Sequence, residues 1–151
     1  DARATDMVRT GEVNLGQLAR ERYGADAVLA VGFGTAIGQV LAARAWDGDG
    51  QLMPVPPPRP DSLEAALFAA GGGDRLLILD PLALATRVLR RVLPHRAIGV
   101  VFDPHGEPRN NYIATVLPAR YDAFVFLPRT RAVVPLRGES WCPRVETGSP
   151  R

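Results

Sequence analysis

Two histidines, His95 and His105, are the side chains of this sequence best suited to acid–base chemistry near neutral pH. Each follows a proline in a segment that we predict to be a loop. A catalytic histidine needs a nucleophile or an orienting carboxylate within hydrogen-bonding distance, and sequence spacing does not specify such a contact. No G-x-S-x-G motif occurs, and Ser62 is better placed to cap a helix. We therefore expect no complete Ser-His-Asp triad in this chain, and no catalytic residue is assigned.

Three aspartates, Asp80, Asp103 and Asp122, each lie at the end of a predicted strand, where the active sites of α/β proteins gather. Carboxylates also stop strands and open turns, and we favour that interpretation. Cys142 is the single cysteine, which excludes an internal disulfide and a multi-cysteine metal site. We interpret it as a surface or partly buried thiol. The sequence thus predicts no metal site and no cofactor.

The segment GFGTAIG, residues 32–38, places three glycines after an apolar run, as a dinucleotide-binding loop would. Its spacing is G-x-G-x-x-x-G, and the residues that follow indicate a strand in place of the helix whose N-terminus would hold a pyrophosphate. We favour a structural role, in which these glycines let the backbone turn or approach a neighbour closely.

The composition indicates one soluble globular domain, because 46% of the 151 residues are apolar and 23% are charged. The net charge of +2 is small, and the arginines are spread along the chain without aromatic residues between them, so we expect no nucleic-acid partner. No apolar run approaches the roughly 18 residues that cross a bilayer, and no leader peptide is evident. The expected location is the cytoplasm, without a membrane partner.

Apolar and turn-forming segments alternate along the chain in a way that is typical of an α/β protein. Asn14 and Gly24 bound one predicted helix, and residues 62–71 and 81–94 are predicted to form two more. The prolines of residues 53–62 predict an irregular loop. The predicted strands span residues 25–33, 38–46, 75–80, 97–103, 112–118 and 122–128.

Several of these strands are nearly continuous apolar runs, which predicts burial on both faces. We therefore expect a layered α/β sheet of mainly buried strands with helices packed on its faces. The first predicted helix has no strand before it, which indicates an incomplete part of a larger domain with polypeptide upstream of Asp1 in the same layer. An open edge of such a sheet would allow self-association, since unpaired strand groups recruit partners.

Five landmarks, in this order and spacing, resemble the C-terminal half of the erythromycin esterase family, which includes proteins labelled as related to succinoglycan biosynthesis. They are the opening DARATDM with GEVNLGQLARERYGADAVLAVGFGT, then RPDSLEAALFAAG, RLLILD, AIGVVFDP and YDAFVFLPRTRAVVPL. The resemblance covers residues 1–137, which we take as part of one erythromycin-esterase-like α/β domain. Residues 138–151 are polar and contain Gly and Pro, so we predict a disordered tail.

The resemblance implies a hydrolase that opens an ester or macrolactone by water attack, with a histidine as general base near an acidic partner. It places those groups mostly upstream of Asp1, and it implies a small-molecule ester or lactone substrate in a cleft lined by Gly34, Thr35 and Gly38. The family often has a His where this chain has Ala36, another where it has Asn111, and an acidic pair where it has Pro128 and Arg129. These departures support an alternative, a non-catalytic remnant or accessory domain that binds a partner or small molecule.

Overall fold

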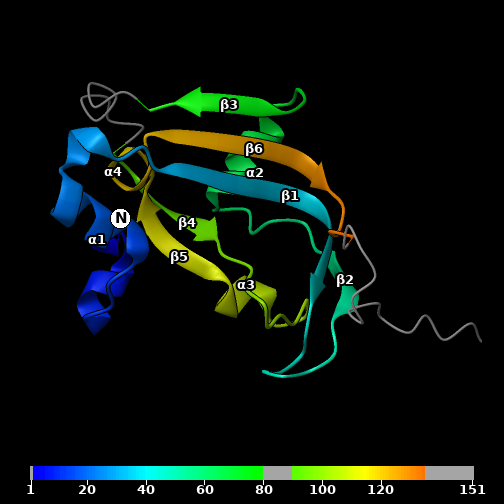
Figure 1. Ribbon diagram of the computed structural model, residues 1–151. Coiled ribbons are helices and arrows are strands. Elements are labelled where there is room, and N and C mark those ends of the chain that lie inside the picture. The colour runs from blue at the N-terminus through cyan, green and yellow to red at the C-terminus, as the bar shows by residue number, and fades with distance from the viewer. Residues whose placement is uncertain (1, 80–89, 135–151) are drawn as a thin grey trace, which may run out of the picture.

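The computed structural model describes residues 2–79 and 90–134, which form a mixed sheet with short helices around it (Figure 1). The elements follow one another as η1 (Ala2–Ala4), η2 (Asp6–Thr10), α1 (Leu15–Tyr23), η3 (Ala25–Ala27), β1 (Val31–Ala42), β2 (Gln51–Val55), α2 (Leu63–Ala69), β3 (Arg75–Ile78), β4 (Val92–Arg96), α3 (Glu107–Asn110), β5 (Tyr112–Val116), α4 (Leu117–Arg120) and β6 (Ala123–Thr130). The predicted tail and most of the predicted helix at 81–94 lie outside the described residues.

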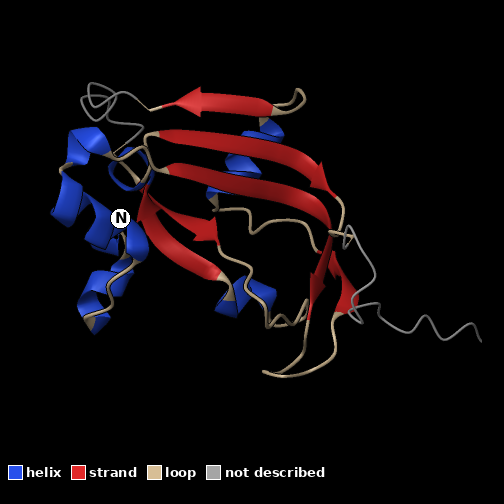
Figure 2. Ribbon diagram, in the orientation of Figure 1, coloured by secondary structure: helices blue, strands red, loops and turns tan. Residues whose placement is uncertain are grey.

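The main sheet has four strands in the order β2-β1-β6-β3. The two central strands, β1 and β6, run parallel, and each edge strand is antiparallel to its neighbour. Strands β4 and β5 form a separate antiparallel pair below the main sheet (Figure 2). This mixed sheet with helices packed against it confirms the predicted α/β class.

One face of the main sheet, which we call the inner face, packs against α2 and β4. The largest side chains buried there come from β6, with Phe124 and Phe126 both fully buried. Leu63 of α2 packs against them, and Leu93 of β4 lies at the edge of the same cluster. The core therefore lies between the sheet, one helix and the β4–β5 pair, because only that face has elements to cover it among the described residues.

Two of the three predicted helix starts lie in the described residues, and both are formed as predicted. The side chain of Asn14 accepts a hydrogen bond from the backbone N–H of Gln17 at 3.0 Å, and Ser62 accepts one from Ala65 at 3.1 Å. Such caps satisfy backbone donors that a helix leaves unpaired, and each contributes about 1 kcal/mol. Gly24 ends α1 at the predicted position, with a φ of 88° that favours glycine.

Residues 25–33 and 38–46 were predicted as two strands, but the structure has a single 12-residue strand, β1, which joins the end of the first to the start of the second. Residues 25–27 form η3. Gly38 lies inside β1 with a φ of 144°, and a Cβ there would overlap the backbone carbonyl of Thr130. A Cβ on Gly34 would lie 2.7 Å from the Phe124 ring. These glycines permit close approach between β1 and β6, which is the structural role that we favoured from the sequence. Because they lie within a strand, they do not form a dinucleotide-binding loop.

The proline-rich segment is partly regular, contrary to the prediction for residues 53–62. Pro54 lies within β2 and pairs in register with Gln39 of β1. The sequence-based argument failed because β2 is an edge strand, where a missing N–H donor is tolerated on the side that has no partner strand.

The assignment of residues 81–103 was also wrong in part. Residues 92–94, predicted as the end of a helix, belong to β4, which pairs with β5. The predicted strand 97–103 has one isolated bridge, between Val101 and Ala43. It nevertheless inserts the buried Phe102 ring beside Ala42 and Met53. An apolar run shows that a segment contributes to a core, but it does not show whether a partner strand is in register.

The second face of the main sheet is largely exposed, which differs from the burial expected on both faces. Phe33 of β1 is 64% exposed, and Leu76 and Ile78 of β3 are 63% and 72% exposed. None of the helices in the described part of the chain is long and apolar enough to cross a membrane.

Candidate functional site

An open groove of about 470 Å³ runs along the middle of β1 and the end of β6. It is lined by Phe33, Gly34, Thr35, Gln39, Val40, Leu41, Arg96, Ala97, Ile98, Leu127, Thr130, Arg131, Ala132 and Val133. Two of the three residues predicted to line a cleft, Gly34 and Thr35, therefore border this groove. Gly38 is not among its lining residues, and its position is explained by the approach of Thr130.

The lining is mostly apolar, with a small number of polar groups. The hydroxyl oxygens of Thr35 and Thr130 lie 3.1 Å apart, and Gln39 and Arg131 add further polar atoms at the wall. No histidine, cysteine or carboxylate belongs to the described lining. The groove can therefore hold an apolar molecule by a few oriented contacts, but its own walls supply no general base.

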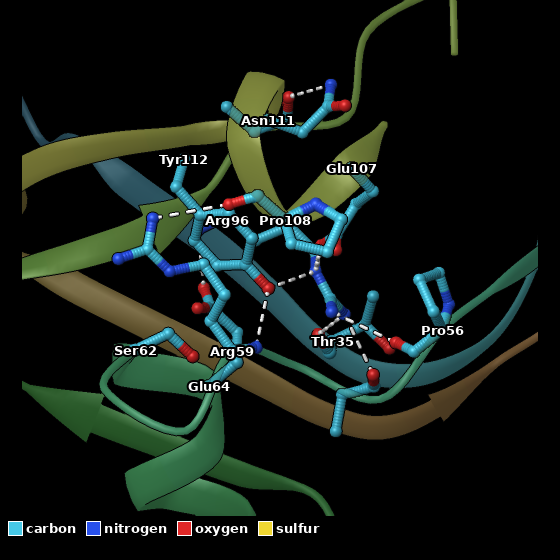
Figure 3. A network of polar contacts seen from close by, with 12 residues as sticks. Thr35, Pro56, Arg59, Ser62, Glu64, Arg96, Glu107, Pro108, Asn111 and Tyr112 are labelled. Atoms are coloured by element: carbon cyan, nitrogen blue, oxygen red, sulfur yellow. Dashed lines mark hydrogen bonds and ion pairs between the residues drawn. The ribbon is translucent and has the colours of Figure 1, made fainter. Parts of the chain in front are cut away.

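Arg96, at the end of β4, fixes the backbone that forms the floor of the groove (Figure 3). Its Nη1 donates to the carbonyl oxygens of Thr35 at 3.1 Å and Ala36 at 2.8 Å, and its Nη2 donates to Pro56 at 3.0 Å. The side chain is 2% exposed. Because these donors are used within the protein, Arg96 shapes the groove and does not serve as a free anion receptor.

The Nε–H of this guanidinium is held by a buried carboxylate. Nε of Arg96 donates to Oε1 of Glu107 at 2.5 Å and to the hydroxyl of Tyr112 at 3.1 Å. Glu107 is the first residue of the short helix α3 and is fully buried. Removing its charge from water is unfavourable unless a partner compensates for it. The Tyr112 hydroxyl also accepts the backbone N–H of Arg59, at 3.0 Å. Arg96 thus joins β1, β4, β5 and the loop after β2.

A second buried pair lies directly beneath Gly34. Nδ1 of His95 lies 2.6 Å from Oε1 of Glu64, and the same oxygen accepts the backbone N–H of Arg96 at 3.1 Å. A Cβ on Gly34 would lie 3.5 Å from this oxygen. The His95 ring also stands edge-on to Phe124, with ring centroids 5.4 Å apart. His95 is 3% exposed and does not line the groove, so this pair organises the layer under the groove.

His105 lies in a turn, as predicted, whereas His95 does not lie in a loop. His95 lies in β4, because a neighbouring strand and a buried carboxylate offset the irregularity that Pro94 suggests. The His105 side chain is 92% exposed, with Nδ1 3.5 Å from Oδ1 of Asp103. Asp103 also accepts the backbone N–H groups of His105 and Gly106, which lowers its pKa chiefly through the bond from His105. Asp103 therefore forms a turn, as favoured.

Asp122 also has a structural role in the described fold. Its Oδ2 accepts the backbone N–H of Ala30 at 2.6 Å and a bond from Nη2 of Arg20 at 2.7 Å. It ties α1 to the start of the two central strands. Asp80 lies outside the described residues.

Glu64, Arg96, Glu107 and Tyr112 carry most of the buried polar contacts, and the sequence analysis singled out none of them. Glu64 follows the cap Ser62, a position where an acidic residue is favourable for the helix and needs no further explanation. The available signal was charge inside otherwise apolar elements, since charged side chains are seldom fully buried unless paired. That signal indicates a buried partner but does not identify it.

Burial raises the pKa of two tyrosines that lie next to these pairs. The pKa of Tyr112 is raised, chiefly because burial disfavours the phenolate, and Arg59 partly opposes this through its backbone hydrogen bond. Burial likewise raises the pKa of Tyr121, whose hydroxyl lies 3.4 Å from Nε2 of His95. Both phenols therefore stay protonated, as hydrogen-bonding groups, at neutral pH.

Groups of three or more His, Cys, Asp or Glu side chains arranged to hold a metal ion do not occur in residues 2–79 and 90–134. The fold and the groove define an α/β sheet domain with an apolar cleft beside its central parallel strands. The chain belongs to the erythromycin esterase family, which its sequence matches over residues 1–130. This confirms the resemblance seen in the sequence.

Two solved structures share the fold. One is the crystal structure of a succinoglycan biosynthesis protein, with 19% sequence identity, a TM-score of 0.62 and alignment over 79% of this chain. The other is a protein from Bacillus cereus, with 18% identity, a TM-score of 0.58 and alignment over 77% of this chain. The present chain spans 28% of the length of each.

Proposed function

We propose that this chain forms part of an erythromycin-esterase-like hydrolase, which cleaves ester or macrolactone bonds by general-base activation of water. The catalytic groups belong mostly to polypeptide upstream of Asp1. The observation that carries this proposal is the combination of family membership over residues 1–130 with a groove whose described walls contain no acid–base side chain.

Lactone hydrolysis needs a base that takes a proton from water and donors that hold the developing oxyanion. In this proposal the groove binds the apolar body of the substrate against Phe33 and Leu127. The Thr35 and Thr130 hydroxyls orient its polar groups. The backbone of Gly34 forms part of the groove floor, with the Phe124 ring packed where a side chain would lie, and Gly38 keeps β1 close to Thr130. Arg96 and the buried His95–Glu64 pair act as positioning residues, because their contacts are made within the protein.

The second candidate is a binding domain without turnover. It is favoured by three positions at which the family often has ionisable residues and this chain does not use them as such. Ala36 is fully buried, and its carbonyl is held by Arg96. Asn111 donates from its side chain to the carbonyl of Ala97 at 3.1 Å. Arg129 is exposed at the end of β6. Positions where the family often has ionisable groups thus have structural or solvent-exposed roles in this chain.

The two candidates are separated by comparing two polypeptides, the 151-residue chain and the longest open reading frame that contains it. Each is incubated with a 14-membered macrolide and with p-nitrophenyl esters, and products are followed by mass spectrometry and absorbance. The hydrolase proposal expects turnover by the longer polypeptide and none by the short one. Thr35→Val should raise KM more than it lowers kcat, because the hydroxyl orients the substrate and does not transfer a proton.

Two results would count against this assignment. No hydrolysis by the longer polypeptide across the panel leaves the binding candidate, which ligand-induced changes in Trp fluorescence would then test. Turnover by the short chain that is abolished by His95→Ala would place the general base within this sequence, and the upstream location of the catalytic groups would be wrong.

A further inference from the structure

The face of the main sheet opposite α2 is a continuous apolar surface, which we call the outer face. It consists of Val31, Phe33, Leu76, Ile78, Val125 and Leu127. The strand register shows that these residues are neighbours, because residues paired directly across strands share one face. Phe33 and Leu76 both pair with Val125, and Val31 and Ile78 flank Ala123 on its two sides.

The outer face differs from ordinary exposed apolar residues in its extent and its lack of charge. Isolated surface hydrophobics are common, whereas a contiguous patch built from three strands marks an interface. None of its six residues is charged, which excludes an electrostatic partner such as nucleic acid. In Figure 1, β3, β6 and β1 run in front of α2, and no described helix covers their near side.

The outer face is continuous with the groove. Phe33 and Leu127 belong to both surfaces. Thr35, which pairs with Leu127, also lines the groove. A layer laid on the outer face would therefore also form the missing wall of the groove. The groove lacks acid–base side chains in its described lining, so this wall is where they can enter.

We propose that the outer face docks a predominantly apolar layer supplied by the preceding part of an erythromycin esterase domain, and that this layer closes the groove. The occupant is identified by two facts. The chain spans 28% of the length of each solved relative that shares its fold, so those proteins contain much polypeptide beyond this region. The patch is apolar and uncharged, which suits the apolar side of a helix or sheet layer. This inference rests on the proposed function only where it expects the added wall to carry acid–base side chains.

Thiol labelling tests the docking without reference to activity. Leu76→Cys and Phe33→Cys are made separately in a Cys142→Ser background, so that each protein has one thiol. Leu15→Cys serves as the matched control, because Leu15 is 81% exposed and lies on α1, away from the outer face. Each variant is prepared as the 151-residue chain and as the longest reading frame that contains it, and circular dichroism verifies that it is folded. Maleimide reaction rates are then measured for all of them.

We expect the Leu76→Cys and Leu15→Cys thiols to react at similar rates in the short chain. In the longer polypeptide, the outer-face thiols should react slower by roughly 100-fold or more, since they become accessible only when the layer opens. The Leu15→Cys thiol should keep its rate. If one outer-face substitution prevents folding, the other provides the same measurement.

Three outcomes would overturn the proposal. The first is equal reactivity of the outer-face thiols in both polypeptides. The second is protection in the short chain that increases with protein concentration together with a dimer in sedimentation, which would assign the face to a second copy. The third is a reading frame without preceding polypeptide. If the longer polypeptide hydrolyses the substrates while its outer-face thiols still react quickly, the docking proposal is wrong and the proposed function stands. If the outer-face thiols are protected but no hydrolysis occurs, the docking proposal stands and the proposed function is wrong.

Discussion

Nδ1 of His95 lies 2.6 Å from Oε1 of Glu64, with the two side chains 4% and 0% exposed. The pair joins β4 to the first turn of α2 under the floor of the groove. Because the glutamate oxygen also accepts the backbone N–H of Arg96, one carboxylate satisfies two buried donors. Buried polar groups of this kind favour one arrangement of strands over others, since any other arrangement leaves them unpaired.

Removing the Glu64 side chain should therefore destabilise the fold. Glu64→Ala removes the partner of Nδ1 of His95 and of the backbone N–H of Arg96, which costs roughly 1–3 kcal/mol for each unsatisfied group. Urea unfolding followed by circular dichroism measures the change in the free energy of unfolding. Glu21→Ala is the control, because Glu21 is 48% exposed, and it should change the unfolding midpoint little. Equal midpoints for the two variants would contradict the proposed structural role of the pair.

Arg96 should not be replaceable by lysine. A lysine keeps the positive charge but lacks the planar fork that reaches Ala36, Pro56 and Glu107 together. We expect Arg96→Ala to lose roughly 3–5 kcal/mol because it leaves a buried carboxylate without its partner, and Arg96→Lys to recover only part of this. Arg44→Ala, at an arginine that is 59% exposed, is the surface control. Full stability of the lysine variant in thermal and urea unfolding would show that charge alone suffices.

Gly38→Ala should be more damaging than the same change at another glycine with positive φ. Gly11 has a φ of 71° and nothing within 4 Å of an added Cβ, so Gly11→Ala reports backbone strain alone, about 1–2 kcal/mol. Gly38→Ala adds a clash with the Thr130 backbone to a φ of 144°. Differential scanning calorimetry should show the larger fall in Tm for Gly38→Ala. Similar falls would mean that β1 and β6 separate easily at this point.

The two partly buried tyrosines, Tyr112 and Tyr121, should make the protein less stable at high pH. Burial raises their pKa values above the ordinary value of about 10 for a tyrosine, so the unfolded chain releases these protons first. The stability from the protonated phenols is complete below the unfolded pKa and is lost as pH rises through the folded pKa. Absorbance at 295 nm should show late ionisation that Tyr112→Phe and Tyr121→Phe each reduce. A titration complete near pH 10 in the native protein would rule this out.

The amino-acid sequence by itself determined the features that depend on near neighbours. The caps Asn14 and Ser62 were predictable, because each bonds to an N–H three residues further on. The last strand, predicted at residues 122–128, forms β6 because its apolar residues are continuous and bounded by turn signals. The family was recognisable for a related reason, since ordered local landmarks survive within one chain.

Tertiary structure alone decided the contacts between distant segments. Glu64 and His95 are 31 positions apart, and Thr35 meets Thr130 across 95. The joining of two predicted strands into β1 depends on how β6 approaches Gly38, and the exposure of the outer face depends on what covers it. Hydrophobic burial is non-directional, so a run of apolar residues shows that a segment is more stable when it is buried. Which segment covers it follows from the packing of the whole molecule.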